Sequence, residues 1–217
     1  MTQHDAHASV PVEAWFDFGS QYSYLSLLRI GEVARVHGVQ VQLRPFLLGP
    51  VFRSLGWSTS PFVLQKAKGE YAWRDVQRRA AGYGLPWRGK PAAFPRSSVL
   101  PARIAQWAGD QPWCLAFCQA VFRLNFLEDR EIDAPEPMRA LLAGMGLPAS
   151  AILEEAQSEA NKLRLRARTQ HAQDIGIFGA PSFIVAGELF WGDDRMEDAF
   201  AHAARVPFRD GGPLQDR

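Results

Sequence analysis

The chain has 217 residues, of which 47% are hydrophobic and 22% charged, which is enough apolar material for a sizeable core and excludes disorder as the main state. Lys and Arg total 24 against 23 Asp and Glu, and nucleic-acid or membrane-surface binders usually carry a much larger basic excess. No apolar run approaches the ~20 residues of a membrane span. Residues 1–11 lack the apolar stretch of a signal peptide, so we expect a cytoplasmic protein.

The N-terminal part predicts a strand, a helix and a second strand. Residues 12–18 alternate and are rich in aromatic side chains, as strands are. Residues 22–36 repeat apolar positions at helical spacing, and Gly38 ends the run. Residues 39–45 alternate strictly, so we expect a right-handed βαβ unit with two parallel strands.

The middle of the chain, residues 50–173, shows helical patterns and no convincing strand. A loop rich in proline and arginine, residues 85–96, follows the first of these patterns. Helices are expected around residues 71–81, 101–108, 113–127, 136–144 and 149–175.

The C-terminal part returns to strands. Ala180-Pro181 precedes an apolar run over residues 182–185, an Ala-Gly turn and a second run over residues 188–191, which together predict a β-hairpin. Residues 195–204 then predict a last helix.

This order of elements favours an α/β, thioredoxin-like fold: a mixed sheet interrupted by an all-α helical insertion. We assign residues 1–49 and 174–206 to a discontinuous thioredoxin-like domain and residues 50–173 to the helical insertion domain. Residues 207–217 are expected to form a flexible tail.

The two cysteines, Cys114 and Cys118, lie one helical turn apart. Parallel side chains on one helix face do not have disulfide geometry, and the spacing matches neither a C-x-x-C redox pair nor a zinc site. We therefore predict that both are buried as small hydrophobic side chains. The histidines show no metal-ligand spacing and no phosphate-binding glycine motif occurs, so we expect no metal and no nucleotide.

The first strand-to-helix corner, Gly19-Ser20-Gln21, is the expected ligand site, because a helix N-terminus offers free N–H groups and positive potential. Redox-active thioredoxin-like proteins carry a C-x-x-C at this corner. This chain has no cysteine there, which excludes disulfide exchange by its own sulfur at that site. The Ser20 hydroxyl can instead donate a hydrogen bond to a thiolate that a ligand supplies. An ordinary helix N-cap is the alternative role.

A second candidate feature is Ala180-Pro181. We expect the backbone N–H and C=O of Ala180 to be left unpaired by the sheet and to face the Ser20 corner, where they can pair with a peptide-like ligand. A simple turn proline is the alternative interpretation.

A third feature is the acidic pair at the start of the last helix. Free N–H groups there can bind a carboxylate while Asp193 or Asp194 binds an adjacent ammonium. The γ-glutamyl end of glutathione carries both charges. A capping box formed by Asp194 and Glu197 accounts for the same residues without a ligand.

Three segments, residues 16–25, 178–183 and 190–196, together resemble the 2-hydroxychromene-2-carboxylate isomerases and the related kappa-class glutathione transferases. These are DsbA-like enzymes of the thioredoxin fold. The resemblance also runs through residues 42–45 and 68–71, and it covers nearly the whole chain from Val12 to about Ala204.

The resemblance implies glutathione as the cofactor and a role for each matching residue. Ser20 matches the catalytic serine that contacts the glutathione sulfur, and Lys68 matches a lysine near its glycyl end. The backbone of Ala180, before a cis Pro181, matches the residue that pairs with the cysteinyl part. The γ-glutamyl head would be held by the pair Asp193 and Asp194.

The chain departs from the family pattern at two positions. Gln21 replaces the proline that usually follows the serine. Trp57 stands where relatives have a glutathione-site asparagine, which suggests a co-substrate of different shape. For a small aromatic second substrate, we expect apolar walls from Trp57, Tyr71, Trp87 and Phe94. Its carboxylate would be held by Arg53, Arg88 or Arg96.

The predicted function is a glutathione-dependent isomerase of aromatic catabolism, in which a thiolate adds to a conjugated double bond, the bond rotates, and elimination returns the glutathione. The first alternative is a kappa-like glutathione transferase or peroxidase. The second is a non-enzymatic thioredoxin-fold binding module. A homodimer is also expected from the resemblance.

Overall fold

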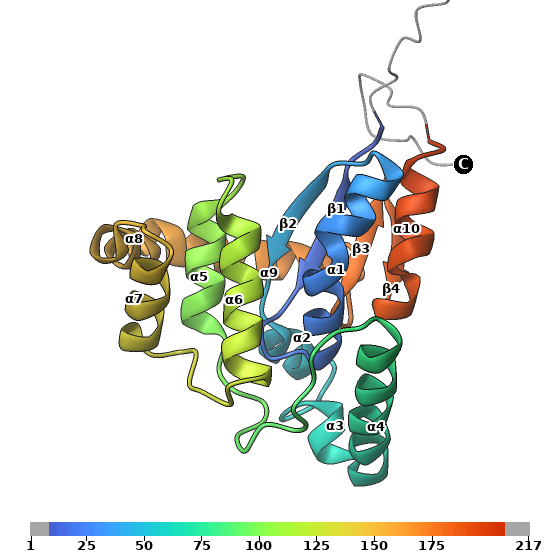
Figure 1. The fold of residues 1–217 in the computed structure, drawn as a ribbon, viewed down its shortest axis with the longest axis horizontal. Helices are drawn as coiled ribbons and strands as arrows, with labels where there is room; N and C mark the ends of the chain where they lie inside the picture. The colour runs from blue at the N-terminus through green and yellow to red at the C-terminus, as the bar shows by residue number, and fades with distance from the viewer. Residues whose placement is uncertain (1–8, 207–217) are drawn as a thin grey trace, which may run out of the picture.

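The computed structural model describes residues 9–206, so the expected tail at residues 207–217 lies outside the described part (Figure 1). The strands are β1 Val12–Phe16, β2 Val41–Pro45, β3 Ser182–Val185 and β4 Glu188–Trp191. The helices are α1 Gln21–His37, α2 Leu48–Ser54, α3 Pro61–Leu64, α4 Lys66–Gly82, α5 Val99–Ala108, α6 Cys114–Phe126, α7 Pro135–Gly144, α8 Ala149–Ala156, α9 Glu159–Asp174 and α10 Met196–Ala203, with a 3-10 turn, η1 Asp193–Arg195, before α10.

The strands form one mixed sheet in the order β2-β1-β3-β4. β1 and β2 are parallel, with Ala14 opposite Leu43, which confirms the predicted βαβ unit. β3 is antiparallel to β1 and to β4, with Phe183 opposite both Ala14 and Phe190, so the predicted hairpin is confirmed. The fold is thus the expected thioredoxin-like α/β architecture with added helices.

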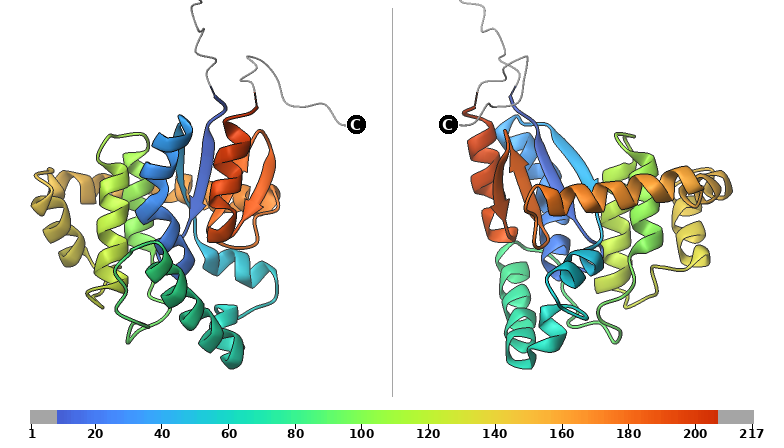
Figure 2. Two further views of the ribbon diagram at one scale, coloured as in Figure 1. Left: turned by 45° about the vertical axis from the view of Figure 1, so that its right-hand side comes forward. Right: turned by 180° about the vertical axis from the view of Figure 1, so that it is seen from behind.

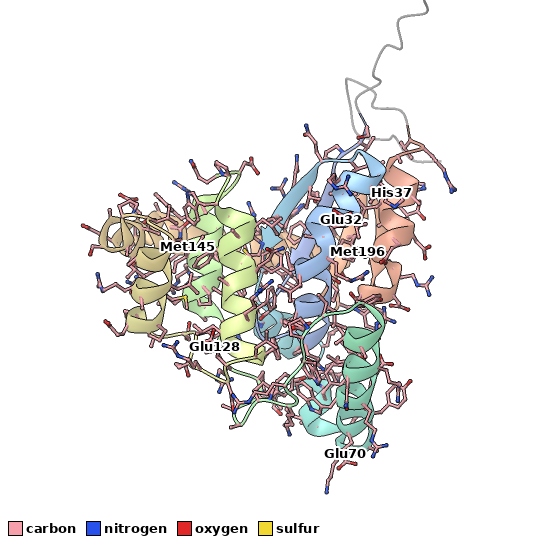
Figure 3. All side chains as sticks on the ribbon, viewed as in Figure 1. Glu32, His37, Glu70, Glu128, Met145 and Met196 are labelled. Atoms are coloured by element: carbon pink, nitrogen blue, oxygen red, sulfur yellow. The ribbon has the colours of Figure 1, made fainter. Side chains whose placement is uncertain are left out.

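Helices cover both faces of this sheet (Figure 1). Phe16 and Phe183 point into the larger core, which α1, α6 and α10 complete. Met196 at the start of α10, labelled in Figure 3, is fully buried there. Trp15 points to the opposite face, into a smaller core with Phe46 and Ala172. The two-residue repeat of a strand therefore separates the side chains of β1 between two cores.

The helices between β2 and β3 form two groups. α6 packs against α1, and α5, α7 and α8 lie beyond it and extend the larger core. α9 runs from α8 to the far face of the sheet, as seen from behind in Figure 2. α3 and α4 project away from the sheet, with Glu70 near the free end of α4 (Figure 3). None of the helices within residues 9–206 is both long and apolar enough to span a bilayer.

The observed helices differ from the sequence-based expectations in three respects. The helix predicted over residues 149–175 is two helices, because the Ser158 hydroxyl caps a new one by accepting a hydrogen bond from Asn161 N at 3.3 Å. α2 and α3 were not predicted, since each is too short to show a periodic pattern. The capping box is absent: α10 has no side-chain cap, and Glu197 instead pairs with Arg29.

Candidate active site

The site is built around the first turn of α1. Ser20 is its N-cap: the hydroxyl oxygen accepts a hydrogen bond from Ser23 N at 3.1 Å, so the N-cap interpretation is correct. The hydroxyl also donates to the carbonyl oxygen of Ala180 at 2.8 Å, across 160 residues of sequence. The N–H groups of Gln21 and Tyr22 have no partner among the described residues. Free helix N–H groups beside a hydroxyl favour an anion at this corner.

The Ala180–Pro181 peptide bond is cis and lies opposite Ser20. The N–H of Ala180 forms no hydrogen bond with residues 9–206, as expected. The carbonyl is likewise not paired by the sheet and faces the corner, as expected, but it accepts the hydrogen bond from the Ser20 hydroxyl. The free N–H of Ala180 and its carbonyl oxygen, which accepts from Ser20, therefore face the corner.

Asp17 holds the corner in place, and the sequence analysis missed it. Its buried carboxylate accepts hydrogen bonds from Gly19 N at 2.7 Å, Leu48 N at 2.7 Å and the Ser98 hydroxyl at 2.8 Å. Burial raises the pKa of the Asp17 carboxyl, against the lowering effect of these bonds. The carboxylate thus ties the turn before α1 to the start of α2 and to the segment before α5. The sequence signal was an acid placed directly after a buried strand.

A cavity of about 1230 Å³ opens beside this corner. Arg88 and Trp87 are not among the residues that line it, so these two predicted contacts are not brought to the site. The other predicted site residues all line it: Ser20, Arg53, Trp57, Lys68, Tyr71, Phe94, Arg96, Ala180, Pro181, Asp193 and Asp194.

The two aspartates at the start of α10 have different surroundings. The Asp193 carboxylate is fully buried and accepts hydrogen bonds from two helices. From α1 come the Ser26 hydroxyl at 2.8 Å and Arg29 at 3.2 Å. From α4 comes Arg79, at 2.6 and 2.8 Å, and from the C-cap directly after α4 comes the Tyr83 hydroxyl at 3.1 Å. Asp193 therefore has its oxygens engaged inside the protein and fastens α4 to the body of the fold.

Asp194, by contrast, exposes 52% of its side chain and pairs with Arg195 at 3.3 Å. Lys68 and Arg53 are exposed and form no ion pair within the described part of the chain. The exposed charges in the cavity lining are therefore the paired Asp194 and Arg195 and the cations Lys68 and Arg53.

Arg96 lines the cavity but is committed to other partners. Its guanidinium donates to the Asn125 side chain at 2.9 Å and to the Asp129 carboxylate at 2.5 Å, and only 6% of its side chain is exposed. Its hydrogen bonds hold the loop between α4 and α5 against the end of α6. A role in holding a substrate carboxylate would need these bonds to be given up.

Aromatic side chains form apolar walls in the cavity. Trp57 packs on Phe52 with ring centroids 5.7 Å apart. Phe178 and Trp191 form an edge-to-face pair at 4.8 Å, although both are partly exposed. Gly179 makes this arrangement possible, because a Cβ at that position would collide with the Trp191 indole. Such walls suit a flat aromatic ligand.

Two further polar groups in the cavity were not predicted. The Tyr22 hydroxyl donates to Asp75 at 3.0 Å, and burial, followed by the Asp75 charge, raises the pKa of Tyr22. The Gln21 side-chain nitrogen is buried with no partner in residues 9–206. The pairing of Tyr22 with Asp75 leaves no local signal in the sequence, because the two residues are 53 positions apart.

The cysteines lie away from this corner. Cys114 and Cys118 are free, buried on α6 and absent from the cavity lining, which confirms that they pack as small side chains. Burial, reinforced by Cys114, raises the pKa of the Cys118 thiol, which disfavours a thiolate. No group of three or more His, Cys, Asp or Glu residues in the described structure could hold a metal ion.

Comparison with known proteins agrees with this architecture. Residues 11–203 match the DSBA-like thioredoxin domain family. The 2-hydroxychromene-2-carboxylate isomerase of Sphingobium xenophagum is 30% identical over 189 residues, covering 86% of this chain and 94% of that protein. The isomerase of the same name from Pseudomonas putida is 27% identical, covering 85% and 90%.

Solved structures give the same result. A structure of 2-hydroxychromene-2-carboxylate isomerase superposes with a TM-score of 0.79 at 26% identity, covering 89% of this chain and 96% of that one. The cytosolic disulfide reductase DsbM from Pseudomonas aeruginosa, solved with GSH, has a TM-score of 0.63 at 16% identity, covering 91% and 100%, which shows the fold alone. The chain therefore belongs to the DSBA-like thioredoxin family of enzymes, together with the 2-hydroxychromene-2-carboxylate isomerases.

Proposed function

We propose that the protein is a glutathione-dependent isomerase that acts on a small aromatic carboxylate of the 2-hydroxychromene-2-carboxylate type. The observation that carries the proposal is the Ser20 corner: a hydroxyl, free helix N–H groups and no cysteine, all facing one large cavity. The relatives named as isomerases support the reaction class.

The residues present fit glutathione. The unpaired N–H of Ala180 suits a backbone hydrogen bond to the cysteinyl part of a tripeptide. Lys68 is a free cation for a carboxylate, and Asp194 is an accessible carboxylate for an ammonium. Asp193 would act indirectly, by holding α4 and with it Lys68. Because Asp193 is saturated by internal donors, we assign the ammonium to Asp194 alone.

Glutathione, when bound, would supply a soft sulfur nucleophile able to add reversibly to a conjugated double bond. The Ser20 hydroxyl would turn its proton from Ala180 O toward the sulfur and stabilise its anionic form. The free N–H groups of Gln21 and Tyr22 and the α1 dipole act in the same direction. The aromatic walls exclude water and orient a flat substrate.

The test follows the isomerisation of 2-hydroxychromene-2-carboxylate by absorbance, with and without reduced glutathione. We expect activity only with glutathione, and a loss of about 10²-fold or more in Ser20→Ala, as for other donors to a developing anion. Ser58→Ala is the matched control, because Ser58 is an exposed serine of the same cavity. A rate that does not depend on glutathione, or one unchanged by Ser20→Ala, would overturn the proposal.

The runner-up function is a kappa-like glutathione transferase, which the same corner would serve equally well. The two activities differ in what happens to the sulfur. A transferase incubated with chlorodinitrobenzene leaves a stable thioether, whereas the isomerase returns its glutathione unchanged. Turnover of the chromene with no net loss of free thiol therefore distinguishes the isomerase.

A further inference from the structure

A second cavity has a volume of about 570 Å³ and is lined by residues of the sheet and of α9. α9 crosses this face of the sheet (Figure 2). It shares no lining residue with the cavity at Ser20. β1 and β2, α5 and α9 all contribute to it, and its polar lining is mostly basic: Glu13, Arg44, Gln106, Arg164, Arg168 and His171.

The acid in this cavity is already neutralised. One oxygen of the Glu13 carboxylate accepts hydrogen bonds from Arg44 at 3.1 and 3.3 Å. The other accepts from the Trp15 indole nitrogen at 3.1 Å. Glu13 and Arg44 thus cancel each other's charge, and the net charge of the cavity comes from its other two arginines.

Arg168 is a partly buried cation without a carboxylate partner. Its guanidinium forms one long hydrogen bond, to Leu43 O at 3.4 Å, and no ion pair with residues 9–206. Burial lowers the pKa of Arg168, and repulsion from Arg44 adds to this. Removing a charge from water without pairing it costs free energy, which a bound anion would recover.

Two more unpaired groups lie beside Arg168. Arg164 lies one turn earlier on α9, so the two like charges share a helix face, and it has no ion pair in the described structure. The Gln106 side-chain oxygen is buried without a partner, and an amide can present either its oxygen or its N–H₂ to a ligand. Guanidinium forks and an amide N–H₂ are donors that suit an oxyanion.

We propose that this second cavity binds a small oxyanion with at least two negative charges, such as phosphate or a dicarboxylate. Arg164 and Arg168 would provide the charge, and Gln106 an additional hydrogen bond. A single negative charge would leave one of the two guanidinium groups uncompensated, so monoanions are expected to bind much more weakly.

The test measures binding of inorganic phosphate, succinate and acetate to the full chain by calorimetry, at constant ionic strength set with chloride. We expect at least tenfold tighter binding of phosphate or succinate than of acetate, and the dianion that binds identifies the ligand class. We also expect Arg168→Met and Arg164→Met each to weaken that binding at least tenfold. Arg164 is exposed, so its substitution disturbs the fold less than that of the half-buried Arg168.

Arg166→Met is the matched control, since Arg166 is an exposed arginine on the same helix outside the cavity lining, and it should bind as the wild type does. Far-ultraviolet circular dichroism verifies that each variant is folded. If Arg168→Met does not fold, the binding measured for Arg164→Met tests the proposal instead. Equal binding of all three anions would overturn the proposal, as would no binding of either dianion, or equal effects of Arg164→Met and Arg166→Met.

Discussion

The hydroxyl of Ser20 can serve both the helix and a ligand, because its oxygen and its proton make separate hydrogen bonds. Its oxygen caps α1 through Ser23 N, while its only proton is given to Ala180 O. A sulfur anion at this corner would compete with that carbonyl for the proton, yet the cap would stay intact because it uses the oxygen. We therefore expect Ser20→Ala to reduce activity more than stability, for which the loss of a cap costs about 1 kcal/mol.

The effect of the α1 N-terminus on a sulfur anion can be tested without a substrate. In Ser20→Cys the new thiol would sit at the α1 N-terminus, where free N–H groups stabilise its anion. We expect its pKa to fall below the usual value of about 8.5, and its alkylation by iodoacetamide at pH 7 to be correspondingly faster than that of an unstructured cysteine peptide. Titrating the rate constant against pH measures the pKa.

Ser58→Cys provides the comparison, because it places a thiol in the same cavity but not at the N-terminus of α1. The native cysteines contribute little background, since both are buried. Equal pKa values for the two introduced thiols would show that the α1 terminus does not stabilise a sulfur anion.

Individual site residues were predictable where a residue type has one local role. A serine after a strand and before a helix predicted the position of Ser20, and a proline before a strand predicted the segment opposite it. It failed for arginines, whose partners are distant in sequence. Arg96 is fixed by Asn125 and Asp129, about 30 residues away, and no local pattern indicates that.

Among the elements, the loop between α4 and α5 is held in part by Asp129, whose carboxylate accepts hydrogen bonds from Arg96 at 2.5 Å and from Ala92 N at 3.0 Å. The Arg96 hydrogen bond, followed by that of Ala92, lowers the pKa of Asp129 below its ordinary 3.8. A lowered folded-state pKa means that the stabilisation is present above pH 3.8 and is lost as the pH falls through the folded-state value.

We therefore expect the difference in unfolding free energy between wild type and Asp129→Asn to be largest at neutral pH and to shrink below about pH 4. Urea unfolding at several pH values measures it. Arg88→Met is the control, because Arg88 is only the weakest of the contributors to this pKa, so the pH dependence should stay almost unchanged. A difference that does not vary between pH 7 and pH 3 would contradict the assignment.

Helices and strands with a strong periodic pattern of apolar residues were predictable, whereas boundaries that depend on single side-chain contacts were not. The alternation in β1 and β2 and the apolar spacing of α1 identified the βαβ unit. The boundary between α8 and α9 depends on a single serine cap inside a continuous helical pattern. The capping box offered as an alternative at the start of α10 does not form, because Glu197 pairs with Arg29 of α1, a tertiary contact that outweighs the local capping signal.

At the scale of the molecule, the site is assembled from parts that the sequence separates widely. The corner comes from β1 and α1, the facing backbone from the segment before β3, and one wall from α4, which Asp193 fastens to α1. A ligand that touches all these parts binds only the folded chain. Ligand binding should therefore raise the stability of the whole molecule.

Reduced glutathione at about 100 times its dissociation constant should add about 2.7 kcal/mol to the free energy of unfolding, or roughly 5–10 °C in Tm for a chain of this size. Asp194→Asn should reduce that shift, because Asp194 is the accessible carboxylate for the ligand ammonium. Asp198→Asn should not, since Asp198 also pairs with Arg195 but lies outside the cavity lining. Differential scanning fluorimetry with both variants measures the effect. An unchanged Tm in the presence of glutathione would contradict this site. An equal reduction of the shift by both variants would contradict the role of Asp194, because a general loss of negative charge at η1 and α10 would then explain the result.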